Sequence, residues 1–436
     1  MRYAILTYGC QMNEHDSEVL GGLCEAQGYR SAPVDEADLI LVNTCSVRDS
    51  AEERVRGKLG ELKRLKALNP RLIIGVAGCM AQREGAELLR RHPQVDLVVG
   101  PGDLARLPEL LRRVRSGQSA AALGGLGTAV AADLPRRRGR GAKAWVSIST
   151  GCDNACSYCI VPAVRGPLVS RAAAAVLEEV RGLAAAGCRE VVLLGQNVDS
   201  FGRDRGEEGA FARLLEEVAA VEGVRRVRFT TSHPRDLDLP TLRAMAAHPN
   251  ISRHLHLPAQ SGSDAILARM GRGYTRDRYL DLLARARRLL GDLAVTTDLI
   301  VGFPGETEEE FGATLDLVDR ARFTGAFTFM FSPRPGTAAA GLPDQVPLDT
   351  KKRRLRRLME RVNFWSGQAN LALVGRVEEV LAEGPSPRHP GMLAGRTGGN
   401  RLVRFPAEGG GAGRMARVEI TAARTWTLEG RVVGWE

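Results

Sequence analysis

Short apolar runs alternate with longer polar segments of helical periodicity over the first hundred residues. Each run is short and apolar, and an amphipathic segment follows it. This alternation predicts βα units on a parallel, doubly wound sheet. The runs that we interpret as strands are Tyr3–Tyr8, Leu39–Asn43, Leu72–Ala77 and Val95–Val99.

The same alternation recurs six times between residues 143 and 335. Helical segments such as Ala172–Ala186, Phe211–Val221 and Tyr279–Leu290 separate the runs. Six consecutive parallel units predict a partial (β/α)6 barrel, in which the chemistry gathers at the carboxyl ends of the strands. The predicted strands are Ala144–Ser149, Glu190–Leu194, Val227–Thr231, His254–Leu257, Ala294–Val301 and Ala326–Phe331.

The pattern changes near the end of the chain. A basic helix with apolar residues at i, i+3 and i+4 begins at Lys351. Beyond Gly375, short β-like runs are separated by Gly and Pro clusters, which predicts a small, closed or nearly closed β-barrel. These runs are Arg376–Ala382, Met392–Arg396, Arg401–Phe405, Arg417–Ala422 and Thr425–Val433.

A Gly/Ala-rich stretch, Ser119–Asp133, has little periodicity and predicts a mobile connector. The arginine run Pro135–Gly141 follows it; we favour contact with RNA phosphates over a solvated linker. The expected units are therefore an α/β domain over 1–118, a linker over 119–137, a barrel domain over 138–368 and a β-barrel over 370–434.

Composition narrows the class of protein. The formal net charge of +10 suits a nucleic-acid partner, although an Arg-rich soluble surface would also produce it. No apolar run is long enough to span a bilayer, and the N-terminus reads as a strand rather than a signal peptide. Eight cysteines in such a chain indicate metal binding rather than disulfides, so we expect a cytoplasmic protein without a membrane partner.

Three cysteines, Cys152, Cys156 and Cys159, follow the first predicted barrel strand at C-x3-C-x2-C spacing. A structural zinc site needs four ligands, and no further Cys or His lies close in sequence. Three thiolates on a four-iron cluster would leave one iron open for a substrate or cofactor. The alternative is an accidental grouping of buried or redox-active cysteines.

A second set of three cysteines is spread over the first domain. Cys10, Cys45 and Cys79 each fall just beyond a predicted strand, about one βα unit apart. Ligands of open α/β sheets bind outside the carboxyl ends of the strands, so the three thiols should lie together. This again predicts a cluster with one open iron, against three independent buried cysteines. We interpret Cys24 and Cys188 as packing residues.

The motif Cys152–Cys159, with Tyr158 before its last cysteine, resembles the radical S-adenosylmethionine (SAM) superfamily. The resemblance implies that the open iron of a [4Fe-4S] cluster chelates SAM, whose cleavage yields a 5′-deoxyadenosyl radical. It also implies SAM contacts around the cluster and at the strand ends. Gly195-Gln196-Asn197 occupies the place where many members have Gly-Gly-Glu, and Gln196 could still accept a hydrogen bond there. Arg171 could instead be a surface charge, and His256 could be a buried imidazole. The candidate cofactor-binding residues are Tyr158, Arg171, Gln196, His256, Gln260 and Asp298.

The sequence motifs around Cys10, Cys45 and Cys79 resemble the N-terminal domain of the methylthiotransferase family. The tail segment Gly395–Phe405 resembles the TRAM domain of that family. In that family the three cysteines hold a second [4Fe-4S] cluster, whose open iron carries the sulfur to be transferred. The TRAM resemblance, with its arginines, implies RNA binding. The three cysteine motifs are Tyr8-Gly9-Cys10-Gln11-Met12-Asn13, Asn43-Thr44-Cys45-Ser46-Val47-Arg48 and Gly78-Cys79-Met80-Ala81-Gln82-Arg83.

Three segments resemble the branch of this family that acts on isopentenylated tRNA. They are Thr44–Arg48, Thr231–Pro234 and the Gly-Arg-Thr-x-x-Asn-Arg of the tail. The branch inserts a methylthio group at C2 of N6-isopentenyladenosine (adenosine 37), just 3′ of the anticodon. The implied partners are the tRNA anticodon stem-loop, an electron donor such as flavodoxin or ferredoxin, and a sulfur source; we expect a monomer.

Two other functions stay open at this point. One is the related branch that acts on threonylcarbamoyladenosine in tRNA. The other is a non-catalytic iron–sulfur RNA-binding protein that senses redox state and would not need SAM.

Overall fold

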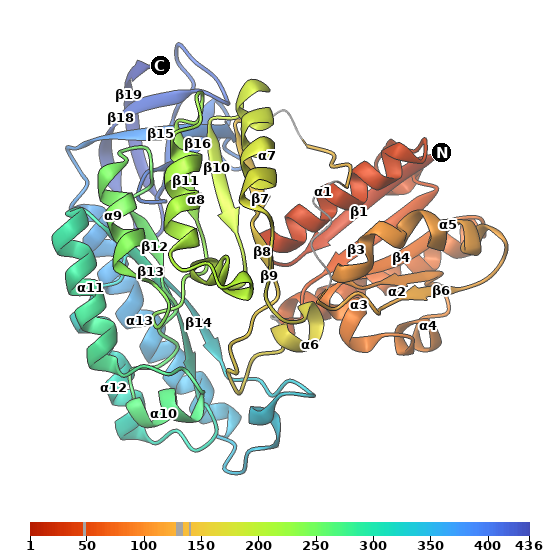
Figure 1. The fold of residues 1–436 in the computed structure, drawn as a ribbon, viewed down its shortest axis with the longest axis horizontal. Coiled ribbons are helices and arrows are strands. Elements are labelled where there is room, and N and C mark those ends of the chain that lie inside the picture. The colour runs from red at the N-terminus through yellow and green to blue at the C-terminus, as the bar shows by residue number, and fades with distance from the viewer. Residues whose placement is uncertain (47–48, 128–133, 139–140) are drawn as a thin grey trace.

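Three folding units follow one another along the chain (Figure 1). The structure is a computed structural model, and it describes residues 1–46, 49–127, 134–138 and 141–436. Val47 and Arg48, residues 128–133 of the predicted connector and Arg140 of the arginine run lie outside the described residues.

The first unit is a parallel six-stranded sheet with strand order β2-β1-β3-β4-β5-β6. This confirms the doubly wound α/β prediction. β3 is buried at every position because helices cover both faces of the sheet. The strands are β1 Arg2–Tyr8, β2 Arg30–Ser31, β3 Leu39–Thr44, β4 Ile73–Gly78, β5 Leu97–Val99 and β6 Ala120–Ala122.

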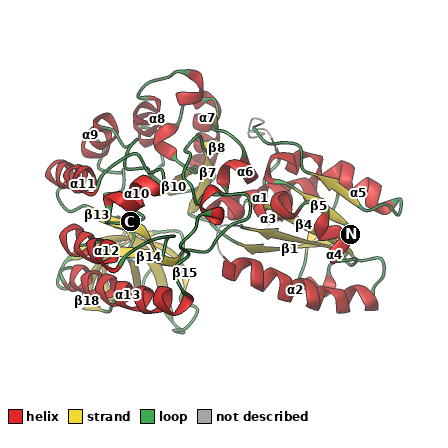
Figure 2. Cartoon of the chain, turned by 90° about the horizontal axis from the view of Figure 1, so that it is seen from below, coloured by secondary structure: helices red, strands yellow, loops and turns green. Residues whose placement is uncertain are grey.

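Helices α1 and α5 cover one face of this sheet and α2 covers the other (Figure 2). Leu20 and Leu110 belong to the first layer of the core, and Leu59 and Leu62 to the second. The helical segments are α1 Gln11–Ala26, η1 Val34–Glu36, α2 Asp49–Leu68, α3 Cys79–Glu84, α4 Glu87–Arg91, η2 Pro101–Arg106 and α5 Leu107–Arg115.

The second unit is the partial barrel. β11, β10 and β7 form one parallel sheet and β12, β13 and β14 another, and the bridge between Val227 and Ile251 joins the two. The six predicted strands are thus confirmed, two of them with the same bounds. They are β7 Lys143–Ser147, β10 Glu190–Leu194, β11 Arg226–Phe229, β12 His254–His256, β13 Ala294–Val301 and β14 Gly325–Met330.

Helices form the outer layer of this barrel (Figures 1 and 2). They are α7 Ala173–Ala185, α8 Ala210–Ala219, α9 Leu239–Ala247, α10 Asp264–Arg269, α11 Arg276–Leu290, α12 Glu308–Ala321 and α13 Leu348–Leu371. Shorter elements lie between the strands: β8 Ser149–Thr150, α6 Val161–Arg165, β9 Val169–Ser170, η3 Val198–Ser200, η4 Arg203–Arg205 and η5 Ala338–Gly341. No described helix is long and apolar enough to cross a bilayer.

The third unit is a closed barrel with strand order β15-β16-β17-β19-β18, as predicted. Its core includes Val380, Phe405 and Ile420. The strands are β15 Val377–Pro385, β16 Met392–Thr397, β17 Leu402–Pro406, β18 Met415–Ala423 and β19 Leu428–Trp435.

Two expectations about the connector are corrected. β6 pairs with β5, so the first sheet continues past residue 118, where we expected the linker to begin. Arg136 and Arg138 form ion pairs with Glu179 on α7 rather than facing RNA, at 2.8 Å for Arg136. The arginine run therefore fixes the connector to the barrel, since its positive charge pairs with a largely buried carboxylate.

A buried ion cluster joins the partial barrel to the C-terminal barrel. Glu190 accepts from Arg226 at 3.2 Å and from Arg228 at 3.4 Å at the amino ends of β10 and β11. The same guanidinium groups donate to main-chain carbonyls of the C-terminal barrel. These carbonyls belong to Glu379, Arg396, Thr397 and Gly398.

The tail segment Gly395–Phe405 takes part in this docking. Part of it lies against the partial barrel: a Cβ on Gly399 would stand 3.3 Å from Ala294 Cβ. Arg401 donates to Asn370 of α13, and burial lowers its pKa to about 10. Gly399 and Arg401 therefore help to position the C-terminal barrel.

We expect Glu190→Gln to lower the free energy of unfolding by about 3 kcal/mol, because it removes the carboxylate that pairs with Arg228 and leaves Arg226 with Glu379 alone. Burial opposes the charge of Glu190, but Arg228 and Arg226 hold its pKa below the usual value. Its contribution is thus present above the unfolded pKa of about 4.3 and is lost as pH falls below it. Calorimetry across this pH range measures both effects.

Glu216→Gln on α8 is the matched control, since Glu216 is exposed. It should change the unfolding free energy by less than about 0.5 kcal/mol. Equal stability of the two variants would show that the cluster does not hold the domains together.

Candidate functional site

The strands of the first sheet bring Cys10, Cys45 and Cys79 together. They follow β1, β3 and β4, which are neighbours in the sheet. β1 and β3 flank the point where the strand order reverses, the usual ligand site of such folds. Cys10 caps α1 and Cys79 begins α3, so both thiols lie at helix N-termini, where negative charge is stabilised.

The electrostatics of these thiols show their proximity. A hydrogen bond with Cys45 lowers the pKa of Cys10 to about 6, against the effect of burial and with help from the charge of Arg165. Burial raises the pKa of Cys79, which Arg165 lowers and Cys10 raises. The group therefore offers closely spaced thiols beside one buried cation.

Two buried asparagines hold the loops that carry these cysteines. Asn13 donates to Asn43 Oδ1 at 3.1 Å, and Asn43 donates to the main-chain oxygen of Asn13 at 2.7 Å. A Cβ on Gly9 would stand 2.3 Å from Asn13 Oδ1, and one on Gly78 would stand 2.4 Å from Asn43 Oδ1. The glycines beside the cysteines are therefore required by close approach. Neither asparagine was predicted as a site residue, although both stand in the motif words.

The loop of Cys152, Cys156 and Cys159 follows β7 and β8 at the carboxyl end of the barrel. Ser157 anchors it, with its amide donating to Met270 O at 3.0 Å and its hydroxyl to Arg269 O at 2.8 Å. Burial raises the pKa of Cys159 to about 12, and the charges of Cys156 and Cys152 raise it further. Thiolates here thus need a compensating positive partner.

Arg272 is a site residue that the sequence analysis missed. Its Nη1 lies 3.4 Å from Cys156 Sγ, and its Nη2 donates to Pro258 O at 2.9 Å. Burial opposes its charge, but Tyr158, Tyr274 and Cys156 hold its pKa above the usual value. The only signal in the sequence was its place in Met270–Tyr274, between glycines.

The short helix α6, just after Cys159, lies between the partial barrel and the N-terminal domain (Figure 1). Ile160 and Val164 pack against Cys79 in one buried cluster. Arg165 at the end of α6 donates to Asp16 Oδ2 at 2.6 Å, and both side chains are buried. A single turn of helix therefore contacts both triads.

Cys10 also faces the partial barrel. Together with Trp145 of β7, it packs on a buried cluster formed by Met12 of α1 and by Val192 and Leu194 of β10. The N-terminal sheet thus presents its first cysteine to the barrel strands, close to the carboxyl end of β10.

The residues at the ends of β8 and β10 fit a polar ligand. Gln196 Oε1 and Ser149 Oγ are both buried and have no hydrogen-bond partner among the described residues. A Cβ on Gly195 would stand 2.7 Å from Ser149 Oγ, so a side chain at this position would crowd the hydroxyl. Buried polar atoms without partners are costly, and the amino and carboxylate groups of SAM would satisfy them.

Three other predicted cofactor residues lie on the inner side of the barrel. His256 contacts Thr296 Oγ1 through Nδ1 at 3.0 Å and Asp298 through Nε2 at 3.5 Å. Gln260 has a positive φ of 69° and its amide donates to Asp298 O at 2.8 Å. The structure therefore brings His256, Gln260 and Asp298 together at the ends of β12 and β13.

Arg171 and Tyr158 are placed differently. Arg171 pairs with Glu179 at 2.6 Å and donates to Ser147 O at 2.6 Å, so its guanidinium serves the barrel wall. The expectation of a SAM contact for Arg171 finds no support in this placement. Tyr158 packs beside a cluster that includes Met270 and Phe303, which fixes the cysteine loop.

No three His, Cys, Asp or Glu side chains in the described part of the chain converge as a single metal ion requires. The thiolates of a four-iron cluster each bind a different iron, so they need not meet at one point. Six cysteines in two sets of three, each with a buried arginine, fit such clusters better than they fit zinc.

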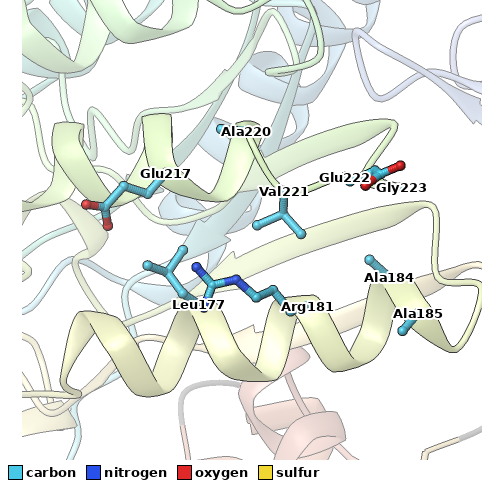
Figure 3. A pocket seen from close by; sticks show the side chains of 9 residues that line it. All are labelled: Leu177, Arg181, Ala184, Ala185, Glu217, Ala220, Val221, Glu222 and Gly223. Atoms are coloured by element: carbon cyan, nitrogen blue, oxygen red, sulfur yellow. The ribbon is translucent and has the colours of Figure 1, made fainter.

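A depression of about 740 Å³ lies away from these residues. Figure 3 shows that its side chains come from α7, the end of α8 and the loop that follows. These segments lead into the amino ends of β10 and β11, opposite to the cysteines. It is a groove between outer helices.

Comparison with known proteins matches the three units in order. Residues 2–100 match the uncharacterized protein family UPF0004, residues 146–318 the radical SAM superfamily and residues 371–433 the TRAM domain. In fold, the chain is similar to the radical SAM methyltransferase TsrM of Kitasatospora setae, with a TM-score of 0.57 at 16% identity over 78% of this chain and 75% of that one. It is also similar to the cobalamin-dependent radical SAM enzyme OxsB, with a TM-score of 0.52 at 13% identity over 83% and 56%.

Relatives of higher identity span the whole chain. The tRNA-2-methylthio-N(6)-dimethylallyladenosine synthase of Moorella thermoacetica is 50% identical over 435 residues, which are 99% of this chain and 98% of that protein. The synthase of the same name from Pelotomaculum thermopropionicum is 47% identical over 98% of this chain and 97% of its own. The chain therefore belongs to the radical SAM methylthiotransferase family that includes these tRNA-modifying synthases.

Proposed function

We propose that this protein is a tRNA methylthiotransferase that inserts a methylthio group at C2 of N6-isopentenyladenosine 37. The observation that carries the proposal is that the segment directly after Cys159 packs on Cys79 of the other triad, through Ile160 and Val164. The names of the full-length relatives support the isopentenylated substrate. The closed C-terminal barrel supports an RNA partner.

Each triad would hold one [4Fe-4S] cluster. Bound there with SAM, the clusters supply the radical and the sulfur of the reaction. Cys152, Cys156 and Cys159 would ligate the first, with Arg272 balancing the charge at Cys156. Cys10, Cys45 and Cys79 would ligate the second, with Arg165 as the adjacent cation.

The chain's own residues place the reactants. Gln196 and Ser149 would bind the polar groups of SAM, since both carry buried oxygen atoms without partners within the described ranges. His256 and Asp298 would line the space beside the target base. The apolar contacts of Met12 and Val192 would exclude water between the two triads.

The further partners are an electron donor such as flavodoxin or ferredoxin and a source of sulfur. We propose that the protein acts as a monomer in the cytoplasm, where tRNA is modified.

Iron content tests the two-cluster proposal. After anaerobic reconstitution the full chain should bind about eight irons. The C10A/C45A/C79A variant should bind about four and still form 5′-deoxyadenosine from SAM with dithionite. The C152A/C156A/C159A variant should also bind about four but form none. Four irons in the unsubstituted chain would contradict the proposal, and an absence of 5′-deoxyadenosine would favour a redox sensor.

The substrate is tested by nucleoside mass analysis of tRNA from a strain that lacks the gene. We expect 2-methylthio-N6-isopentenyladenosine to disappear and N6-isopentenyladenosine to accumulate. Complementation with the intact chain should restore the methylthio product, and the cysteine variants should not. Loss of a methylthiolated threonylcarbamoyladenosine instead would assign the chain to the other branch.

SAM affinity tests the strand-end contacts. Gln196→Leu should weaken SAM binding about tenfold, because one hydrogen bond to a charged group is lost. Equilibrium dialysis with the reconstituted chain measures this, and the visible absorbance of the clusters should stay unchanged. Gln368→Leu is the matched control, because Gln368 is exposed on α13. Equal affinities of the two variants would remove Gln196 from the SAM site.

A further inference from the structure

An apolar groove of about 350 Å³ runs along β14, the edge strand of the partial barrel. β14, α13 and the loop between β18 and β19 form its walls. Phe327 is 53% exposed, Met359 45% and Trp426 54%, so three large apolar side chains face solvent in one place. The lining residues are Ala326, Phe327, Thr328, Phe329, Met359, Val362, Asn363 and Trp426.

The loop that carries Trp426 is fixed to α13. Ser366 Oγ lies 3.0 Å from Thr425 O, and Asn370 donates to Arg424 O at 2.8 Å and to Thr425 O at 3.0 Å. The loop is closed by a bond from Arg424 N to Thr427 O at 2.8 Å. The exposed indole is therefore held beside β14 by buried polar contacts, which gives the groove a preformed shape.

Positive charge borders the groove. Lys352 and Arg356 are exposed and lie on the face of α13 that carries Met359 and Asn363, by helical spacing. Within the described ranges, neither forms an ion pair. The other basic residues of α13 are engaged: Lys351 with Phe331 O, Arg353 with Thr350, Arg354 with Glu306, Arg357 with Glu308 and Arg361 with Asp319.

One residue of the groove wall also contacts the inner side of the barrel. The ring of Phe327 meets the ring of His256 edge to face, with the centroids 6.1 Å apart. His256 in turn lies 3.5 Å from Asp298, among the predicted site residues. Phe327 therefore stands at the junction between the candidate active site and the groove.

We infer that this groove binds unpaired nucleotides of the tRNA anticodon loop that flank the target adenosine. Bases would stack on Phe327 and Trp426, and phosphates at the Met359 end of the groove would lie near Lys352 and Arg356. Exposed aromatic rings with adjacent cations are the usual elements of single-stranded RNA recognition. An acidic protein partner would use the two cations but would not need two exposed aromatic planes. The inference rests on the proposed function, because it takes tRNA as the substrate.

RNA binding by the full-length, reconstituted chain tests the inference. The probe is an anticodon stem-loop RNA with N6-isopentenyladenosine at the target position and 2-aminopurine in a neighbouring loop position. Phe327→Ala and Trp426→Ala should each weaken RNA binding about tenfold. Each should also reduce the quenching of 2-aminopurine fluorescence that accompanies binding. Phe364→Ala is the matched control, since Phe364 is 50% exposed on α13 but does not line the groove.

The salt dependence tests the phosphate contacts. Lys352→Gln and Arg356→Gln should each reduce the slope of log K against log salt by about 0.7. Arg353→Gln should leave the slope unchanged, because Arg353 is exposed on the same helix and bonds to Thr350.

Affinities and quenching equal to those of Phe364→Ala would overturn the inference. Unchanged RNA binding with slower cluster reduction by flavodoxin would also overturn it and assign the groove to a protein donor. The methylthio product of the unsubstituted chain is measured separately. If that product forms while the groove variants bind normally, only the groove proposal fails; if it does not form, the proposed function fails.

Discussion

The buried ion pair between Asp16 and Arg165 is the contact on which the arrangement of the site depends. Burial disfavours both charges, so the pair is stable only when α1 of the first domain and α6 of the second lie against each other. Arg165 follows Cys159 in the same short segment, and Asp16 follows Cys10 in the same helix. Separation of the domains would leave two charges without partners. The pair therefore fixes the distance between the two cysteine triads.

Different kinds of residue occupy the amino end, the middle and the carboxyl end of the partial barrel. Its amino end is sealed by Glu190, Arg226 and Arg228 and is covered by the C-terminal barrel. Its middle is apolar where Met12 of the first domain packs on Val192. Its carboxyl end carries the cysteine loop and the buried oxygens without partners. The ion cluster, the apolar contact with the first domain and the cysteine loop thus follow one another from the amino to the carboxyl end of the barrel.

Much of this could be predicted from the sequence. β10 and β13 have the predicted bounds because each is a continuous apolar or alternating run. The six cysteines follow strands, so strand prediction also placed them. β6 was missed because three alanines carry little hydrophobic signal. The roles of Arg136, Arg165 and Arg272 depend on partners distant in sequence, and no local pattern reveals such partners.

Part of the docking of the C-terminal barrel uses its main chain. Arg226 and Arg228 donate to carbonyl oxygens of β15, β16 and the segment after β16. Every residue type carries a carbonyl oxygen, so most substitutions in these strands leave the hydrogen bonds intact. The outward side chains of the domain are therefore free to diverge during evolution without detaching it. The affinity of this domain for different nucleic acids can therefore change within a family while its interface with the partial barrel stays the same.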